Sequence, residues 1–173
     1  MNRSVTFKLT HEPQNICSGG KLVVSTKGTT NITTLQRISG ERNLDLKVAE
    51  VSDHAEGFRA VESGKADAFA MDDVLLFGLR ARSTNPNSFS VIGKSMSLEP
   101  YAIMLPKAQP RFQKIVDSTI RRIILDHEIE ALYHKCFESP ISPEGINLEL
   151  KMPYVLRDSF RAPTSRVHDW YLD

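Results

Sequence analysis

A regular alternation of short β-branched runs with amphipathic stretches dominates the first half of this chain. Residues 21–25 (KLVVS), 46–51 and 67–71 are apolar runs typical of strands, and a helical pattern follows each of them. Parallel neighbours in a sheet need crossover connections, which are usually helical. The order β-α-β-α-β therefore predicts an α/β fold with a parallel sheet. Ligands of such sheets bind beyond the carboxyl ends of the strands.

Local residues also predict where the first helices begin and end. The first helix should end at Gly40, because glycine is common just after a helix. The second should begin at Asp53, since Glu56 follows three residues later as in a capping box, and it should end at Gly64.

The second half of the chain is mainly helical in its pattern. Residues 91–92 and 101–105 are expected to be strands. Apolar side chains between 112 and 124 recur at i, i+3 and i+4, which is the clearest helical pattern of the sequence, and 129–137 repeat it. From 139 onward, prolines interrupt a tail with little periodicity.

Composition excludes several classes of function. The 173 residues carry a net charge of +1 and no basic block interleaved with aromatics, so nucleic acid is not an expected partner. No apolar stretch approaches the ~20 residues that a membrane helix needs. The N-terminus is polar after Arg3 and does not resemble a secretory signal. Cys17 and Cys136 have neither zinc-site spacing nor a disulfide framework, and we expect no metal or cofactor.

Polar residues gather where the first predicted strand ends. The sequence STKGTT at 25–30 places Gly28 before the helix, where backbone N–H groups and the hydroxyls of Thr29 and Thr30 suit a carboxylate or phosphate. The simpler alternative is that Thr29 or Thr30 only caps the helix. The stretch is neither a Walker motif nor a dinucleotide fingerprint.

The next two strands also end in polar residues. His54 is a candidate donor to an anion, or else a solvated loop histidine. Asp72 is a natural partner for an ammonium, although capping explains one of the pair Asp72 and Asp73. Anion donors beside a carboxylate suit a zwitterion with an extra acid group. Enzyme chemistry fits less well, because Ser25 lacks an activating motif and no nucleophile elbow is present.

Three stretches of the sequence closely resemble a known family. The motifs S-x-x-G-T-T, D-H-x-x-x-F-R-x-x-E-S-G and M-D-D, at these separations, are similar to the second lobe and return crossover of solute-binding proteins of ABC amino-acid uptake systems. The glutamate/aspartate-binding members are nearest, and the resemblance runs from about residue 20 to about residue 147. It implies a parallel-sheet lobe of the type II periplasmic-binding-protein fold with C-terminal helices, and binding without catalysis.

Residue roles follow from the resemblance by matching position. It implies that Gly28, Thr29 and Thr30 bind the α-carboxylate of an amino acid. It also implies that Asp72 binds the α-ammonium and His54 the acidic side chain. The implied partners are glutamate or aspartate and the membrane subunits of an ABC transporter. The implied compartment is the periplasm, with the cytoplasm as the alternative because no leader is recognised.

The chain departs from the family at its N-terminus. The family's first lobe supplies an arginine for the α-carboxylate, and residues 1–19 do not match it. We therefore expect a shortened protein: a non-matching segment at 1–19, the ligand-gripping lobe at 20–105, and C-terminal helices and tail at 106–173. Loss of the first lobe should weaken binding. It should also leave the C-terminal helices to pair in a homodimer, swapped through residues 106–173. The open alternatives are a sensory or enzymatic domain on a similar scaffold and a remnant without a ligand.

Overall fold

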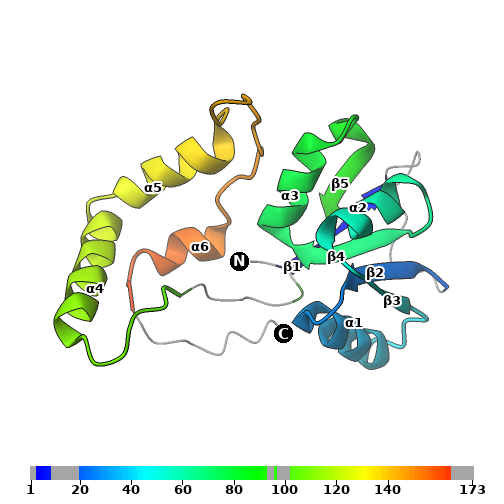
Figure 1. Cartoon of the computed structure of the whole chain (residues 1–173), viewed down its shortest axis with the longest axis horizontal. Helices are drawn as coiled ribbons and strands as arrows, with labels where there is room; N and C mark the ends of the chain where they lie inside the picture. Colours follow the sequence, from blue (N-terminus) through cyan, green and yellow to red (C-terminus); the bar gives the residue numbers. More distant parts are fainter. Residues whose placement is uncertain (1–2, 9–19, 93–95, 97–101, 165–173) are drawn as a thin grey trace. The chain divides into compact units, whose positions relative to one another are not determined.

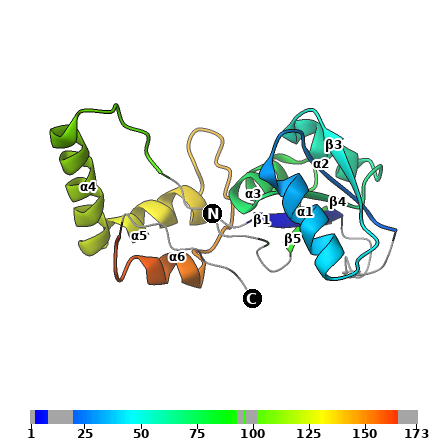
Figure 2. The same cartoon turned by 90° about the horizontal axis from the view of Figure 1, so that it is seen from below.

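A computed structural model describes residues 3–8 (backbone only), 20–92, 96 and 102–164 of the chain. The chain divides after residue 99 into two compact units. The first contains a sheet with helices on both faces, and the second is helical (Figures 1 and 2). Within the described ranges, no helix is both long and apolar enough to cross a membrane.

The sheet of the first unit has five strands in the order β3-β2-β4-β1-β5. Their bounds are β1 Arg3–Lys8, β2 Leu22–Thr26, β3 Lys47–Val51, β4 Ala68–Asp72 and β5 Phe89–Ile92. Strand β2 runs parallel to both β3 and β4, which confirms the predicted α/β fold with a parallel sheet.

Strand β1 comes from the segment that the sequence placed outside the lobe. It pairs antiparallel with β4 on one side and with β5 on the other, so that Val5 lies opposite both Ala70 and Ile92. This segment therefore completes the sheet. Comparison of motifs did not reveal this role, because a strand in mid-sheet needs only suitable backbone pairing and imposes no distinctive motif.

Helices cover both faces of the sheet. Helix α1 (Thr30–Glu41) lies on one face, and α2 (His54–Glu62) and α3 (Asp73–Arg82) lie on the other; a short 3-10 helix, η1 (Pro86–Ser88), precedes β5. One buried cluster joins the sheet to α2 and α3: Val24, Phe58, Val61, Ala66, Phe69, Met71, Leu76 and Phe89. The other joins it to α1: Val23, Leu35, Ala68 and Ala70. Successive residues of β4 thus serve opposite faces, as the period of a strand requires.

Two helix ends test the predicted stops. Helix α1 continues through Gly40 to Glu41, so the predicted end at Gly40 is wrong. The residue in the left-handed conformation after this helix is Asn43, with φ 49°. Asparagine tolerates this conformation better than most residues. Helix α2 is followed by Gly64 at φ 74°, which confirms the predicted stop.

The second unit confirms the two predicted amphipathic helices. Helix α4 spans Pro110–Leu125, and α5 (Glu128–Tyr133) continues into the π-helical segment η2 (His134–Glu138). A short helix that the sequence did not predict, α6, covers Tyr154–Ser159. The predicted strand at 101–105 is wrong for residues 102–105, which belong to none of the strands in the described part of the chain and include the 96% exposed Met104; Tyr101 is not described.

Candidate ligand-binding site

The predicted ligand residues come together at one edge of the first unit. Strand β2 lies between β3 and β4, with Ser25 opposite Glu50 on one side and Ala70 on the other. Each of these three parallel strands is followed directly by a helix. The N-termini of α1, α2 and α3 therefore lie at the carboxyl edge of the sheet. We call this region the carboxyl edge.

The loop between β2 and α1 has the sharp turn that the sequence predicts. Gly28 has φ +75°, and a Cβ there would meet nothing within 4 Å. The backbone N and the Oγ1 of Thr29 both donate to the carbonyl of Thr26, at 3.3 and 2.8 Å. Thr29 occupies the N-cap position of α1, but its side chain makes no capping bond. The structure therefore does not support the alternative that the Thr29 side chain serves only as a helix cap. The positive end of the α1 dipole lies at this edge.

Ser25 links the loop between β2 and α1 to strand β4 through its hydroxyl group. Its side chain is fully buried, and its Oγ donates to the carbonyl of Ala70 at 3.0 Å. The same Oγ lies 3.4 Å from Thr29 Oγ1. With its proton directed to a backbone carbonyl, Ser25 has a structural role at the base of the loop.

His54 is the first residue of α2 and is half-buried. Its Nδ1 lies 2.7 Å from the Oγ1 of Thr26, the last residue of β2. Sequence reasoning missed Thr26. The available indication was its place at the end of a strand beside predicted ligand residues, which is where side chains from two strands meet.

Asp53 is occupied as the cap of α2. Its Oδ1 accepts from the backbone N of Glu56 at 2.7 Å, and this hydrogen bond lowers the pKa of Asp53 below its ordinary value. Glu56 in turn accepts from the backbone N and the hydroxyl of Ser52, and the Ser52 hydroxyl is the main cause of a lowered pKa of Glu56. The predicted capping box is confirmed for Asp53. Its second half reaches Ser52, one residue earlier than the usual partner.

The two aspartates after β4 have different surroundings. Asp73 is 7% exposed, and its Oδ1 accepts from the backbone N of Val74 at 2.7 Å, in the first turn of α3. Asp72 holds the N-cap position, is half-buried and makes no side-chain capping bond. The Asp72 carboxylate therefore does not serve as the side-chain cap of α3, and its role as a ligand residue stays a prediction.

Asn31 is a polar residue of this region that the sequence did not single out. It lies in the first turn of α1 and is 2% exposed. Within the described part of the chain, its Nδ2 donates to the sulfur of Met71 at 4.0 Å, and its buried Oδ1 has no hydrogen-bond partner. A buried carbonyl oxygen without a hydrogen-bond partner is uncommon. The Asn31 amide is therefore a buried polar group at the start of α1, close to the carboxyl edge.

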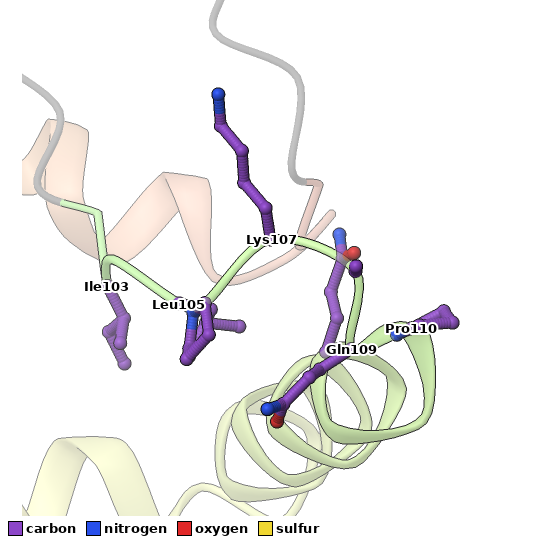
Figure 3. Close-up of a pocket in the computed structure, with 8 residues that line it drawn as sticks. Ile103, Leu105, Lys107, Gln109 and Pro110 are labelled. Atoms are coloured by element: carbon purple, nitrogen blue, oxygen red, sulfur yellow. The ribbon is translucent and has the colours of Figure 1, made fainter.

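A hollow in the second unit is unrelated to the predicted site. It is lined by residues from the connection that leads into α4, including Ile103, Leu105, Lys107 and Gln113. Figure 3 shows Lys107 pointing away from Ile103 and Leu105, so the charged group does not converge with other polar groups. The hollow lacks the convergent polar groups of a specific ligand pocket.

Comparison with known proteins agrees with the fold and the motifs. The chain is 37% identical over 148 residues to the glutamate/aspartate import solute-binding protein of Salmonella typhimurium, a match that covers 86% of this chain and 49% of that protein. The L-glutamate/L-aspartate-binding protein of Pseudomonas aeruginosa is 36% identical over 148 residues, with the same coverage. No family model matches the sequence.

Solved structures have the same fold. The ABC transporter periplasmic binding protein of Brucella ovis with glutathione bound superposes with a TM-score of 0.65 at 18% identity, over 75% of this chain and 41% of that one. The glutamate-bound ligand-binding core of GluR0 from Nostoc punctiforme gives a TM-score of 0.57 at 25% identity, over 79% and 61%.

The curated matches extend over most of this chain, which spans about half the length of the relatives. The structural matches add the α/β arrangement of type II periplasmic binding proteins to that sequence similarity. The chain therefore belongs to the amino-acid solute-binding proteins of ABC transporters.

Proposed function

We propose that this chain binds an acidic amino acid, glutamate or aspartate, at the carboxyl edge and catalyses no reaction on it. The observation that carries the proposal is the convergence of three helix N-termini at this edge, with that of α1 lacking a side-chain cap. Such an end favours a carboxylate. The curated relatives named above are described as glutamate- and aspartate-binding, which supports the same ligand class.

The three parts of the ligand have separate partners in this proposal. The α-carboxylate lies against Gly28, Thr29 and Thr30, where the turn and the start of α1 supply backbone N–H groups. The α-ammonium pairs with Asp72, a carboxylate not used as a side-chain cap of α3. His54, at the start of α2, donates to the acidic side chain. Each charged group of the ligand thus meets either a carboxylate or hydrogen-bond donors of the protein.

The affinity of the chain by itself is proposed to be weak. The carboxyl edge provides one wall, so a bound glutamate keeps charged groups that are only partly paired. Removing one partner of a buried charge pair typically costs ~2–5 kcal/mol. Each 1.4 kcal/mol is a factor of ten in the dissociation constant. The affinity for glutamate is therefore roughly one to four decades lower than that of a site closed by both lobes.

The proposed biological role is that of the receptor of an ABC importer. The relatives are described as import solute-binding proteins. By resemblance to this family, the chain would deliver its amino acid to membrane subunits from the periplasm. Membrane subunits are therefore the proposed macromolecular partner, and the periplasm is the proposed compartment.

Isothermal calorimetry tests the proposal directly. Glutamate and aspartate should give saturable binding in the range of roughly 10 μM to 10 mM, and Asp72→Asn should weaken both. The matched control is Asp67→Asn, because Asp67 lies just before β4 and pairs instead with Lys21 at 3.2 Å. Submicromolar binding would contradict the proposed weakness, and no saturable binding of either amino acid would contradict the function itself.

A further inference from the structure

A threonine–histidine pair joins two of the elements that form the carboxyl edge. Thr26 ends β2 and is 8% exposed, whereas His54 begins α2 and is half-buried. Although 28 residues separate them in sequence, Thr26 Oγ1 and His54 Nδ1 are 2.7 Å apart. This hydrogen bond is the only one found for the His54 ring among the described residues.

The threonine hydroxyl has a well-defined position. The backbone of Thr26 lies opposite Val51 in the ladder between β2 and β3. The carbonyl of Thr26 accepts hydrogen bonds from both the N and the Oγ1 of Thr29. Threonine is also branched at Cβ, which restricts its χ1 rotation. A hydroxyl held in this way sets the direction of whatever it bonds, and here that is one nitrogen of the imidazole.

The chemistry of the two groups determines which ring nitrogen is left. In the neutral ring one nitrogen donates and the other accepts, and the tautomer follows the bond that the ring makes. A hydroxyl can donate to an unprotonated Nδ1 or accept from a protonated one. Among the described residues, Nδ1 of His54 is the only hydrogen-bond partner found for the Thr26 hydroxyl. That hydroxyl proton therefore goes to Nδ1, and the proton of the neutral ring is then on Nε2.

We infer that Thr26 is a positioning residue: its hydroxyl donates to Nδ1 of His54 and holds the neutral ring in the Nε2–H tautomer. The Nε2–H is thereby reserved for the side-chain carboxylate of the ligand. This inference rests on the proposed function and deepens it, because it makes Thr26 a determinant of the preference for acidic side chains. Thr26 itself does not contact the ligand.

Nitrogen-15 NMR of the histidine ring provides a readout that a merely structural role would not move. At a pH where the ring is neutral, long-range proton–nitrogen spectra of the wild-type protein should show an unprotonated Nδ1 and a protonated Nε2 for His54. Thr26→Val keeps the shape of the side chain and removes the hydroxyl, so it should yield a mixture of tautomers. Thr26→Ser should restore the wild-type pattern. Thr33→Val, which removes a hydroxyl that donates to the carbonyl of Thr30 within α1, is the control.

Ligand titrations link the tautomer to binding. Loss of one hydrogen bond of ordinary strength should weaken glutamate about five- to tenfold in Thr26→Val. Glutamine binding should change by less than about twofold, and Thr26→Ser should rescue glutamate. If Thr26→Val does not fold, the tautomer of the wild-type ring and the Thr26→Ser titration still decide the matter.

The outcomes separate this inference from the function on which it rests. A wild-type protein that binds glutamate but carries its proton on Nδ1 of His54 would overturn the inference alone. So would a folded Thr26→Val variant with unchanged preference for glutamate over glutamine. A wild-type protein that binds no acidic amino acid would overturn the proposed function, and the role of Thr26 with it.

Discussion

Gly57 of α2 packs directly on the ring of Phe69 of β4, so closely that a Cβ at position 57 would lie 2.5 Å from a ring carbon. Phe69 is fully buried. We therefore expect Gly57→Ala to destabilise the first unit by about 1–3 kcal/mol, as overpacking of a core does. Urea unfolding followed by circular dichroism measures the change.

The matched control for this substitution is Gly40→Ala. Gly40 also lies within a helix, but a Cβ there meets nothing within 4 Å. Alanine is the better helix former by about 1 kcal/mol, so Gly40→Ala should stabilise the protein. Equal effects of the two substitutions would show that the contact between Gly57 and Phe69 is not as tight as described.

The cap of α2 should make stability depend on acid. Hydrogen bonds in the folded state lower the pKa values of Asp53 and Glu56 below their ordinary values of 3.8 and 4.5. Groups with a depressed folded pKa contribute stability above their unfolded pKa and lose it as the pH falls through the folded one. The contribution of this cap should therefore be complete at neutral pH and disappear below about pH 4.

Thermal unfolding at a series of pH values tests this dependence. Asparagine at position 53 still accepts the bond from the Glu56 amide but does not titrate in this range. The double variant Asp53→Asn/Glu56→Gln should show a smaller decrease of the melting temperature between neutral and acid pH than the wild type. Parallel curves for the two proteins would mean that the cap does not contribute to acid sensitivity.

Much of the fold was predictable, because periodicity alone reports which face of an element is buried. The strand of Phe69 and the helix of Leu35 follow from their apolar spacing. Helix ends were less predictable, since Gly40 and Asn43 both suit a helix end and only packing decides between them. The strand predicted at 101–105 was wrong for its described part because β-propensity needs a pairing partner to take effect.

The site was predictable in its position but not in its contacts. Ligand residues after successive parallel strands must share one edge, and His54 and Asp72 do so. The partner of His54 was not predictable, because the bond to Thr26 depends on the register between two strands that are distant in sequence. The buried amide of Asn31 was also not predictable, because its burial depends on tertiary packing.

Two substitutions should separate the roles of the site residues. Asp72→Asn removes the proposed partner of the ammonium, which all amino acids share, so it should weaken glutamate, aspartate and glutamine alike. His54→Ala removes the donor to the acidic side chain, so it should weaken glutamate and leave glutamine nearly unchanged. Chemical-shift titrations measure both effects. Equal losses for glutamate and glutamine in His54→Ala would remove His54 from the side-chain pocket.

The apolar face of α4 leads us to expect a homodimer. Phe112, Ile115 and Ile120 are between 39% and 60% exposed, and apolar faces of this kind usually mark an interface. Exchange of residues 106–173 between two copies of the chain would cover the apolar face of α4 in each copy, in a closed two-fold dimer. Light scattering at tens of micromolar should then give about twice the 19.5 kDa mass of the chain.

A matched pair of lysine substitutions tests the role of this face. Ile115→Lys places a charge on the exposed apolar side, whereas Ser118→Lys places the same charge on the polar side of α4. Only Ile115→Lys should reduce the measured mass to that of one chain. A wild-type protein of single-chain mass, with Phe112 and Ile120 protected from solvent, would show instead that the helices fold back within one chain.

The location of the ligand is tested most directly by mapping backbone amide shifts while glutamate is added to the wild-type protein. Saturable shifts should concentrate on residues 26–31, 53–55 and 72–74, the ends of β2, β3 and β4 and the starts of the helices that follow them. Aspartate should shift the same amides. Saturable shifts confined to the hollow at 103–113, or no saturable shifts with either amino acid, would contradict a ligand site at the carboxyl edge.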